Sequence, residues 1–314
     1  MLILQSCNLN VGKTFKNDHI DASTRQQIKA LNDQLFTAIR TGKPGAIKDM
    51  LSDTLRHSDL IGMGKTLAAV SSSMHAEGYD VLSEYYVNNK TTGALTTLPD
   101  SDYVISFVSL NKEMYVSLLT TNKPESKLMI TVVYGKYGSE WKINILQFGQ
   151  YSFFGKAAPA YYEMAKISYA KNNLIDAANY MGIAKECSNP ANQLLKYPQE
   201  QEMKTFYERV IKEVNNHYKV PYALENIKTK PKVYRIAPFP MKDAFYPMVY
   251  YVSGVSLKDS VGVKAENVKV KQEVDRVFVG INVDKKYVLY WAFDSIPNGH
   301  NNPPHRGFID TLAR

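Results

Sequence analysis

Four ionisable side chains are the candidates for chemistry in this sequence. His57 and Asp59 lie within one helical turn of each other, and His300 and His305 lie in a polar loop near the C-terminus. A histidine or a carboxylate can abstract a proton when its pKa lies near the working pH. Exposed residues at a helix end and a surface loop are the simpler interpretations of these two pairs.

Metal, cofactor and nucleotide chemistry are not expected. The spacing of His300 and His305 matches no zinc-ligand pattern, and the two prolines between them favour an extended loop. Two Gly-Lys-Thr triplets occur, at 12–14 and 64–66, but neither follows an apolar strand. Both also lack the glycine five residues earlier that a phosphate-binding loop needs.

The elements around the first pair predict an α+β domain. Apolar side chains recur at helical spacing in three segments, with Ser23 as the expected N-cap of the first: 23–40, 47–55 and 60–74. From Gly78 the apolar period changes to two, which predicts five strands: 79–87, 103–110, 113–120, 128–134 and 141–148. Helices followed by strands indicate a curved antiparallel sheet with helices packed on one face.

Two short motifs bound this region. The first helix ends in Thr41-Gly-Lys-Pro-Gly-Ala46, and the last strand opens with Gly138-Ser-Glu-Trp141-Lys-Ile143. With these motifs, residues 23–152 resemble the NTF2-like (SnoaL-like) superfamily. The resemblance implies a cone-shaped sheet with a pocket between the sheet and its helices.

The same resemblance suggests roles for individual residues. Pocket enzymes of this class use a carboxylate or a histidine as a base, which points to His57 or Asp59. They polarise the substrate with a tyrosine or an acid, a role that Tyr85 or Tyr86 could fill, and Trp141 is a further candidate for the pocket.

The second half predicts a helical connector over 153–222 and a small α+β domain over 223–314. Small and apolar residues between Tyr161 and Ala184 are spaced like one tetratricopeptide repeat, and a third helix is expected over 199–218. Three prolines in 228–240 predict a linker. The final domain shows no family resemblance, and its expected elements are strands over 245–253, 278–283 and 287–293 and a helix over 256–277, opened by the capping box Ser256-Leu-Lys-Asp259.

The N-terminus contains Leu4-Gln5-Ser6-Cys7, with an aliphatic residue three positions before the cysteine and a small residue directly before it. This resembles the lipobox of bacterial lipoproteins, in which the cysteine is lipidated. The resemblance implies a membrane anchor at Cys7, a location in the cell envelope, and a signal remnant and polar tether over 1–22. No basic segment precedes the cysteine, and a cytoplasmic protein with an incidental cysteine is the alternative.

Charge and hydropathy exclude two further classes. The net charge is +8, but lysines alternate with acids and no run of five like charges occurs, so a solvated basic surface is expected rather than a nucleic-acid site. No stretch of about 18 apolar residues is present, so no membrane-spanning helix is expected.

These patterns predict an interaction or scaffold protein of the cell envelope that is not an enzyme. The connector and the tyrosine-rich C-terminal domain would present surfaces to a protein partner. A small-molecule binder that uses the cone pocket is one alternative. An enzyme, acting in the cone or at the loop of His300 and His305, is the other, although no common catalytic motif is present.

Overall fold

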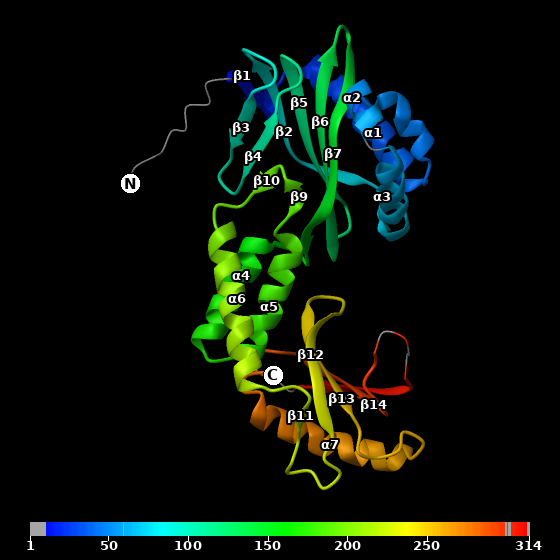
Figure 1. Ribbon diagram of the computed structural model, residues 1–314, viewed down its shortest axis with the longest axis vertical. Helices are drawn as coiled ribbons and strands as arrows, with labels where there is room; N and C mark the ends of the chain where they lie inside the picture. Colours follow the sequence, from blue (N-terminus) through cyan, green and yellow to red (C-terminus); the bar gives the residue numbers. More distant parts are fainter. Residues whose placement is uncertain (1–10, 59, 299, 301–302, 313–314) are drawn as a thin grey trace. The chain divides into compact units, whose positions relative to one another are not determined.

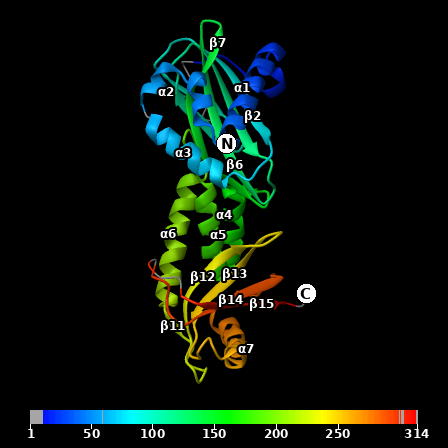
Figure 2. The same cartoon turned by 90° about the vertical axis from the view of Figure 1, so that its right-hand side faces the viewer.

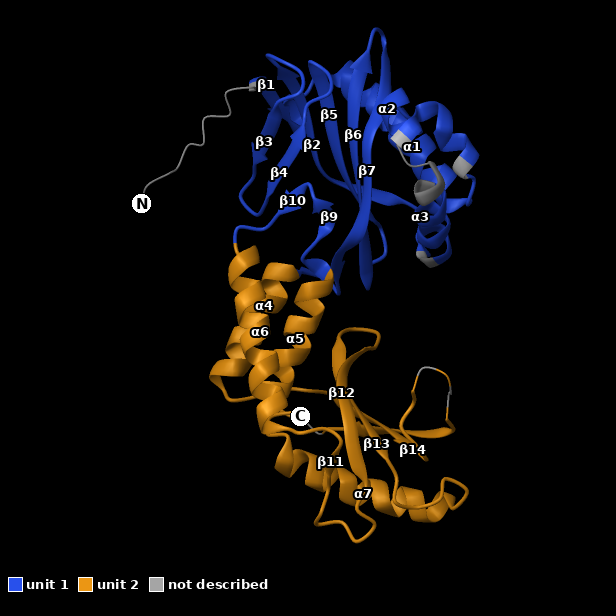
Figure 3. Ribbon diagram, in the orientation of Figure 1, with its two compact units in different colours: residues 1–157, 187–198 blue, residues 158–186, 199–314 orange. Residues whose placement is uncertain are grey.

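The computed structural model describes residues 11–58, 60–298, 300 and 303–312 (Figure 1). Contacts divide the chain into two units (Figure 3). Unit 1 comprises Met1–Ala157 and Cys187–Pro198, and unit 2 comprises Ala158–Glu186 and Gln199–Arg314. The division into four parts at 22, 152 and 222 remains a prediction.

Unit 1 is built on a curled six-stranded antiparallel sheet in the order β1-β2-β5-β6-β7-β8. Its strands are β1 (Val11–Lys16), β2 (Tyr79–Asn89), β5 (Glu113–Thr121), β6 (Ser126–Tyr137), β7 (Glu140–Phe153) and β8 (Lys156–Ala157). A second sheet, in the order β10-β4-β3, is made by β3 (Leu95–Pro99), β4 (Val104–Val108) and β10 (Leu195–Lys196), and β9 (Pro190–Gln193) precedes β10. The α+β class and the curled antiparallel sheet are as predicted.

Helices pack against one face of the curled sheet. They are η1 (Asn17–His19), α1 (Ala22–Arg40), η2 (Pro44–Met50), α2 (Asp53–Ser58) and α3 (Leu60–Ser73). The apolar stripe of α1, which includes Ile28, Leu35 and Ile39, shares one core with Tyr115 and Tyr134 of the strands. Because successive strand residues point to opposite faces, only alternate strand positions reach this core.

Two expectations for the N-terminal segment are wrong. The expected tether contains β1, which pairs with β2 from Val11 to Lys16 and places Phe15 6.2 Å from the ring of Tyr86. The N-cap of α1 is Asp21 rather than Ser23, because the Asp21 carboxylate accepts the Thr24 N–H at 2.9 Å, whereas the Ser23 hydroxyl itself donates to Asp21. An aspartate at this position satisfies an otherwise free helical N–H.

Unit 2 combines helices with a five-stranded sheet in the order β11-β12-β13-β14-β15. The helices α4 (Ala158–Ala170), α5 (Leu174–Cys187) and α6 (Glu200–His217) form where the connector was predicted. The strands are β11 (Tyr222–Ala223), β12 (Lys232–Pro240), β13 (Phe245–Val252), β14 (Tyr287–Phe293) and β15 (His305–Thr311). The parallel strands β13 and β14 are joined through α7 (Ser260–Val277), which packs on one face of the sheet (Figures 1 and 2).

Unit 2 corrects four expectations. The expected linker contains β12. On the outer side of β12, the short strand β11 pairs only with Lys232 and Val233. Pro238 and Pro240 therefore lie where no described strand pairs with that side, and their missing N–H groups cost no hydrogen bond of the sheet. Residues 278–283 form turns rather than a strand, and α7 begins after Asp259, which caps it in place of Ser256. The C-terminal strand β15 was not expected.

Candidate functional site

The sheet of unit 2 has two different faces. Val249 and Tyr251 of β13 pack against α7, so the alternate residues of each strand point the other way. We name this second surface the aromatic face. Its aromatic side chains come from all four long strands: Tyr234, Phe239, Tyr246, Tyr250, Tyr287, Trp291, Phe293 and His305.

A row of rings crosses the aromatic face with one ring from each strand. The centroids of Tyr234 and Tyr250 are 6.1 Å apart, those of Tyr250 and Trp291 are 5.6 Å apart, and those of Trp291 and His305 are 4.5 Å apart. Tyr234, Tyr250 and Trp291 are half-buried and His305 is exposed. A side chain at Gly307 would begin 3.3 Å from the indole nitrogen of Trp291, so this glycine lets the indole lie over β15.

Charged groups lie at different places on the aromatic face. At one end, Asp243 in the turn between β12 and β13 accepts from the Tyr246 hydroxyl at 3.0 Å and pairs with Lys286. The strands β12 to β15 contain one acidic residue, Asp310, which lies in the register facing α7 and pairs with Lys271 of that helix at 2.7 Å.

The exposed guanidinium of Arg235 lies 5.3 Å from the ring centre of Tyr250, within cation–π range. Burial raises the pKa of Tyr234 to about 12, so its phenol stays neutral at physiological pH. Around Tyr250 and Arg235 the face therefore offers aromatic surface and positive charge.

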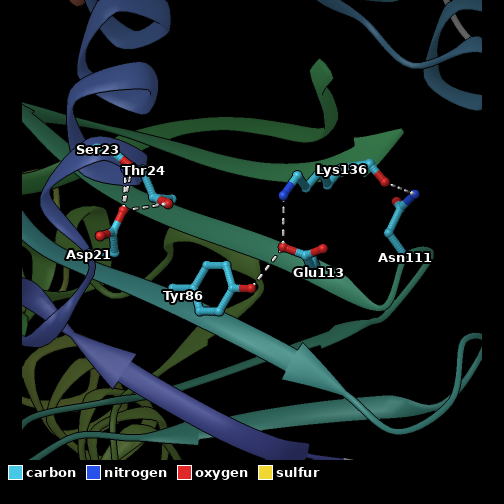
Figure 4. Close-up of polar contacts among 7 residues, drawn as sticks. All are labelled: Asp21, Ser23, Thr24, Tyr86, Asn111, Glu113 and Lys136. Atoms are coloured by element: carbon cyan, nitrogen blue, oxygen red, sulfur yellow. Dashed lines mark hydrogen bonds and ion pairs between the residues drawn. The ribbon is translucent and has the colours of Figure 1, made fainter. Parts of the chain in front are cut away.

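One candidate in unit 1, Tyr86, belongs to a polar cluster with Glu113 and Lys136 (Figure 4). The Tyr86 hydroxyl donates to Glu113 at 2.8 Å, and the Lys136 ammonium donates to the same carboxylate at 3.0 Å. Burial and this hydrogen bond raise the pKa of Tyr86 to about 12. Although burial opposes the change, the bonds from Tyr86 and Lys136 lower the pKa of Glu113, so the carboxylate stays ionised and is a weak base at neutral pH.

Trp141 is a core residue. Its side chain lies edge-on to Tyr86 and Tyr115, with ring centroids 6.4 and 6.3 Å away, and only 7% of the residue is exposed. The interior of the curled sheet is filled at this point by side chains of the chain itself.

Tyr85 and Tyr86 point to opposite faces of β2 and do not share a site. Tyr85 donates to the carboxylate of Asp100, which Lys16 also contacts at 2.7 Å. Although burial opposes the change, these contacts lower the pKa of Asp100 to about 2. His57 is exposed, and its Nδ1 lies 2.7 Å from the carbonyl oxygen of Asp53 in its own helix. Asp59 lies outside the described residues.

A groove of about 690 Å³ runs between α1 and β2 in unit 1. Four of the charged groups that line it pair with each other: Arg25 with Glu84 at 3.1 Å, and Lys29 with Asp33 at 2.6 Å. None of Tyr85, Tyr86 and Trp141 lines this groove. It differs from the enclosed apolar pocket that is typical of a small-molecule site.

The remaining candidates are dispersed. His300 is exposed, with its backbone N–H bonded to Asn298, whereas His305 stacks on Trp291 and Phe293. Within the described ranges, no three histidine, cysteine or acidic side chains gather as metal ligands. Cys7 lies outside the described residues. No helix in the described part of the chain is long and apolar enough to cross a membrane.

Comparison of the chain with protein-family models, with curated proteins and with solved structures found no match.

Sequence reasoning singled out His305 as a catalytic candidate and missed Arg235, Tyr250 and Trp291. A signal for the aromatic face was present. In 246–250 and 287–293, every second residue is large and apolar or aromatic, and neither segment contains an acid. The positions between them are apolar too, which hid the alternation.

Proposed function

We propose that the chain is a non-enzymatic binding protein that holds a protein partner against the aromatic face, and that Cys7 anchors it in the cell envelope. The observation that supports this most directly is the partly buried row of rings beside the exposed Arg235, since the one acid of β12 to β15, Asp310, points to the α7 side. Tryptophan, tyrosine and arginine are the residues enriched at the energetic centres of protein interfaces. The positive charge of Arg235 favours an acidic partner surface, and the rings favour apolar groups on that surface.

Site-specific cross-linking tests the partner surface. A photo-reactive aromatic amino acid replaces Phe239 of the aromatic face in one sample and the exposed Lys43 of unit 1 in a matched control, so that Arg235 is kept in both. We expect one partner to be captured from position 239 only, and capture to disappear when Trp291→Ser is added to a chain whose circular dichroism is unchanged. Equal capture from both positions would remove the support for this surface.

A second arm addresses nucleic acid, which also combines negative charge with planar groups. A fluorescent single-stranded oligonucleotide is titrated into the full chain at physiological salt. We expect no saturable binding. If the oligonucleotide bound the wild type but not the Trp291→Ser variant, nucleic acid would be the partner of the aromatic face instead of a protein.

Fractionation tests the anchor. Wild type and Cys7→Ser are expressed from the natural gene start, and we expect membrane association of the wild type alone. An identical distribution of the two forms would favour the incidental cysteine.

We also infer that unit 1 is an NTF2-like domain in a supporting role. A curled antiparallel sheet with helices on one face supports this assignment, and Trp141 filling the interior supports a role without a cone ligand. Saturable binding of a small molecule that protects residues around Trp141 from hydrogen exchange would contradict it.

A further inference from the structure

Among the described residues, no strand pairs with the outer edge of β15. All seven of its residues pair with β14, and it is the last strand in the order of the sheet. The Leu312 N–H donates to the Lys286 carbonyl oxygen at 3.0 Å, which sets the alternation of the ladder. In an antiparallel pair, every second residue directs its N–H and C=O away from the partner. In β15 these residues are His305, Gly307, Ile309 and Thr311.

An apolar groove of about 660 Å³ lies beside this edge, between β15 and α7. Two aliphatic side chains of α7 on its wall are unusually exposed: Val261 at 78% and Val268 at 53%. The other lining residues are Ser260, Lys264, Ala265, Arg306, Gly307 and Phe308. The lining therefore contains two cations and no carboxylate. The Arg306 Nε donates to the Leu257 carbonyl oxygen at 2.7 Å, which holds the guanidinium at this place.

We propose that β15 accepts an extended segment of another protein as an added strand. The backbone of the segment would bond to Gly307, Ile309 and Thr311, and its alternate side chains would enter the groove along α7. Strand addition of this kind derives affinity from backbone bonds and specificity from pockets for alternate side chains. The seven residues of β15 match a segment of about the same length, since paired strands advance at equal steps.

Charge defines the chemistry of that segment. Lys264 and Arg306 flank the apolar wall, so the segment needs aliphatic residues at alternate positions and an aspartate, a glutamate or a terminal carboxylate next to them. Pairing of β15 with a second copy of itself would bring two Arg306 side chains to the same interface, and like charges placed together oppose association. An acidic segment of a different protein therefore fits better than self-pairing.

This edge adjoins the aromatic face at His305 and Gly307, and the inference goes beyond the proposed function because it uses the outer backbone groups of β15. Arg235 and Tyr250, on β12 and β13, lie in strands that do not pair with β15. A Tyr250→Ser variant can therefore weaken the first surface without altering the second.

Selection and a matched pair of variants test the proposal. A phage library of random octapeptides is selected on the full chain, and enriched peptides are synthesised with a fluorophore for anisotropy titrations. We expect sequences that alternate aliphatic residues and contain an acid. The Ile309→Pro variant removes one outward N–H, so we expect about tenfold weaker binding, whereas Ile309→Ala keeps that N–H and binds within about threefold of wild type.

Two further variants complete the test. Lys264→Glu is expected to weaken binding of the acidic peptides, and Tyr250→Ser is expected to leave it unchanged. Thermal melting confirms that Ile309→Pro remains folded. Enrichment of no common pattern, or equal binding by Ile309→Pro and Ile309→Ala, would overturn strand addition. A wild-type dimer that Ile309→Pro converts to a monomer would overturn it in favour of self-pairing.

Discussion

The polar cluster of unit 1 and the aromatic face of unit 2 use the same kinds of side chain in opposite ways. Each combines tyrosine, tryptophan and a cation on one face of a sheet. In unit 1 the cation Lys136 and the tyrosine Tyr86 both bond to Glu113, and Trp141 is buried beside them. In unit 2 the cation Arg235 lies on Tyr250, and no carboxylate from the strands accompanies it.

The difference is the presence of the carboxylate. A charged group that is paired within its own chain has less to gain from a partner, because the partner would have to replace an existing bond. An exposed guanidinium on a half-buried ring retains its hydrogen-bonding capacity and adds stacking surface. A tyrosine, a tryptophan and a cation therefore stabilise the fold in unit 1, whereas the same kinds of side chain can bind a partner in unit 2.

The largest expected effect contrasts the two tryptophans. Trp141→Ala should lower the free energy of unfolding by about 3–5 kcal/mol, because it leaves a cavity in a packed core. Trp291→Ala should lower it by only about 1–2 kcal/mol, because this ring lies on a sheet face and is only partly buried. Urea titrations followed by far-UV circular dichroism measure both values.

The tryptophan that each variant retains provides an internal control. The chain contains two tryptophans, one in each unit, so each variant keeps one tryptophan in the unit that was not changed. That fluorophore should keep its wild-type emission maximum in the absence of urea. Equal costs for the two substitutions would make Trp291 a core residue and would break the comparison.

A smaller effect is expected from Asp100, the carboxylate that Lys16 and Tyr85 share in unit 1. Its pKa falls from 3.8 to about 2 on folding, so the pairing stabilises the folded state at every pH above 3.8. That contribution, about 2 kcal/mol, is lost as the pH falls from 3.8 towards 2. Asp100→Asn should lower the free energy of unfolding by about this amount at pH 7.

The pH profile identifies the cause. Between pH 5 and pH 2 the difference in unfolding free energy between wild type and Asp100→Asn should shrink towards zero. A difference that stays constant over this range would mean that the substitution acts through packing rather than through charge.

The sequence predicted the elements whose burial follows a simple period. The helix α1 and the inner strands β5, β6 and β7 formed where apolar spacing placed them. The strands β1 and β15 were missed because both are edge strands with mostly exposed residues, so no apolar alternation marks them. Prolines concealed β12 in the same way, since their position on a free edge is a property of the sheet and not of the local sequence.

The candidate site was harder to predict than the fold for a related reason. Whether a cation has a carboxylate partner depends on contacts between distant residues, such as Lys16 with Asp100, 84 positions apart. No local motif encodes such a pairing, and none encodes its absence around Arg235. His305 stood out by residue type alone, and its stacking on Trp291 depends on the pairing of β15 with β14.

The smallest expected change in stability is at Arg235, and it sharpens the comparison most. Arg235→Ala should alter the free energy of unfolding by no more than about 0.5–1 kcal/mol, because the side chain is exposed and its stacking on Tyr250 is a weak contact. Binding of the cross-linked partner should nevertheless weaken about tenfold or more, as arginine anchors do in interfaces. The matched variant Lys136→Ala, which removes a cation paired with Glu113, should leave that binding unchanged. Titration of the purified partner at two salt concentrations measures both effects, and the loss at Arg235 should diminish at high salt, where charge attraction is screened. If Lys136→Ala weakened binding as much as Arg235→Ala, pairing within the chain would not be what separates the two surfaces.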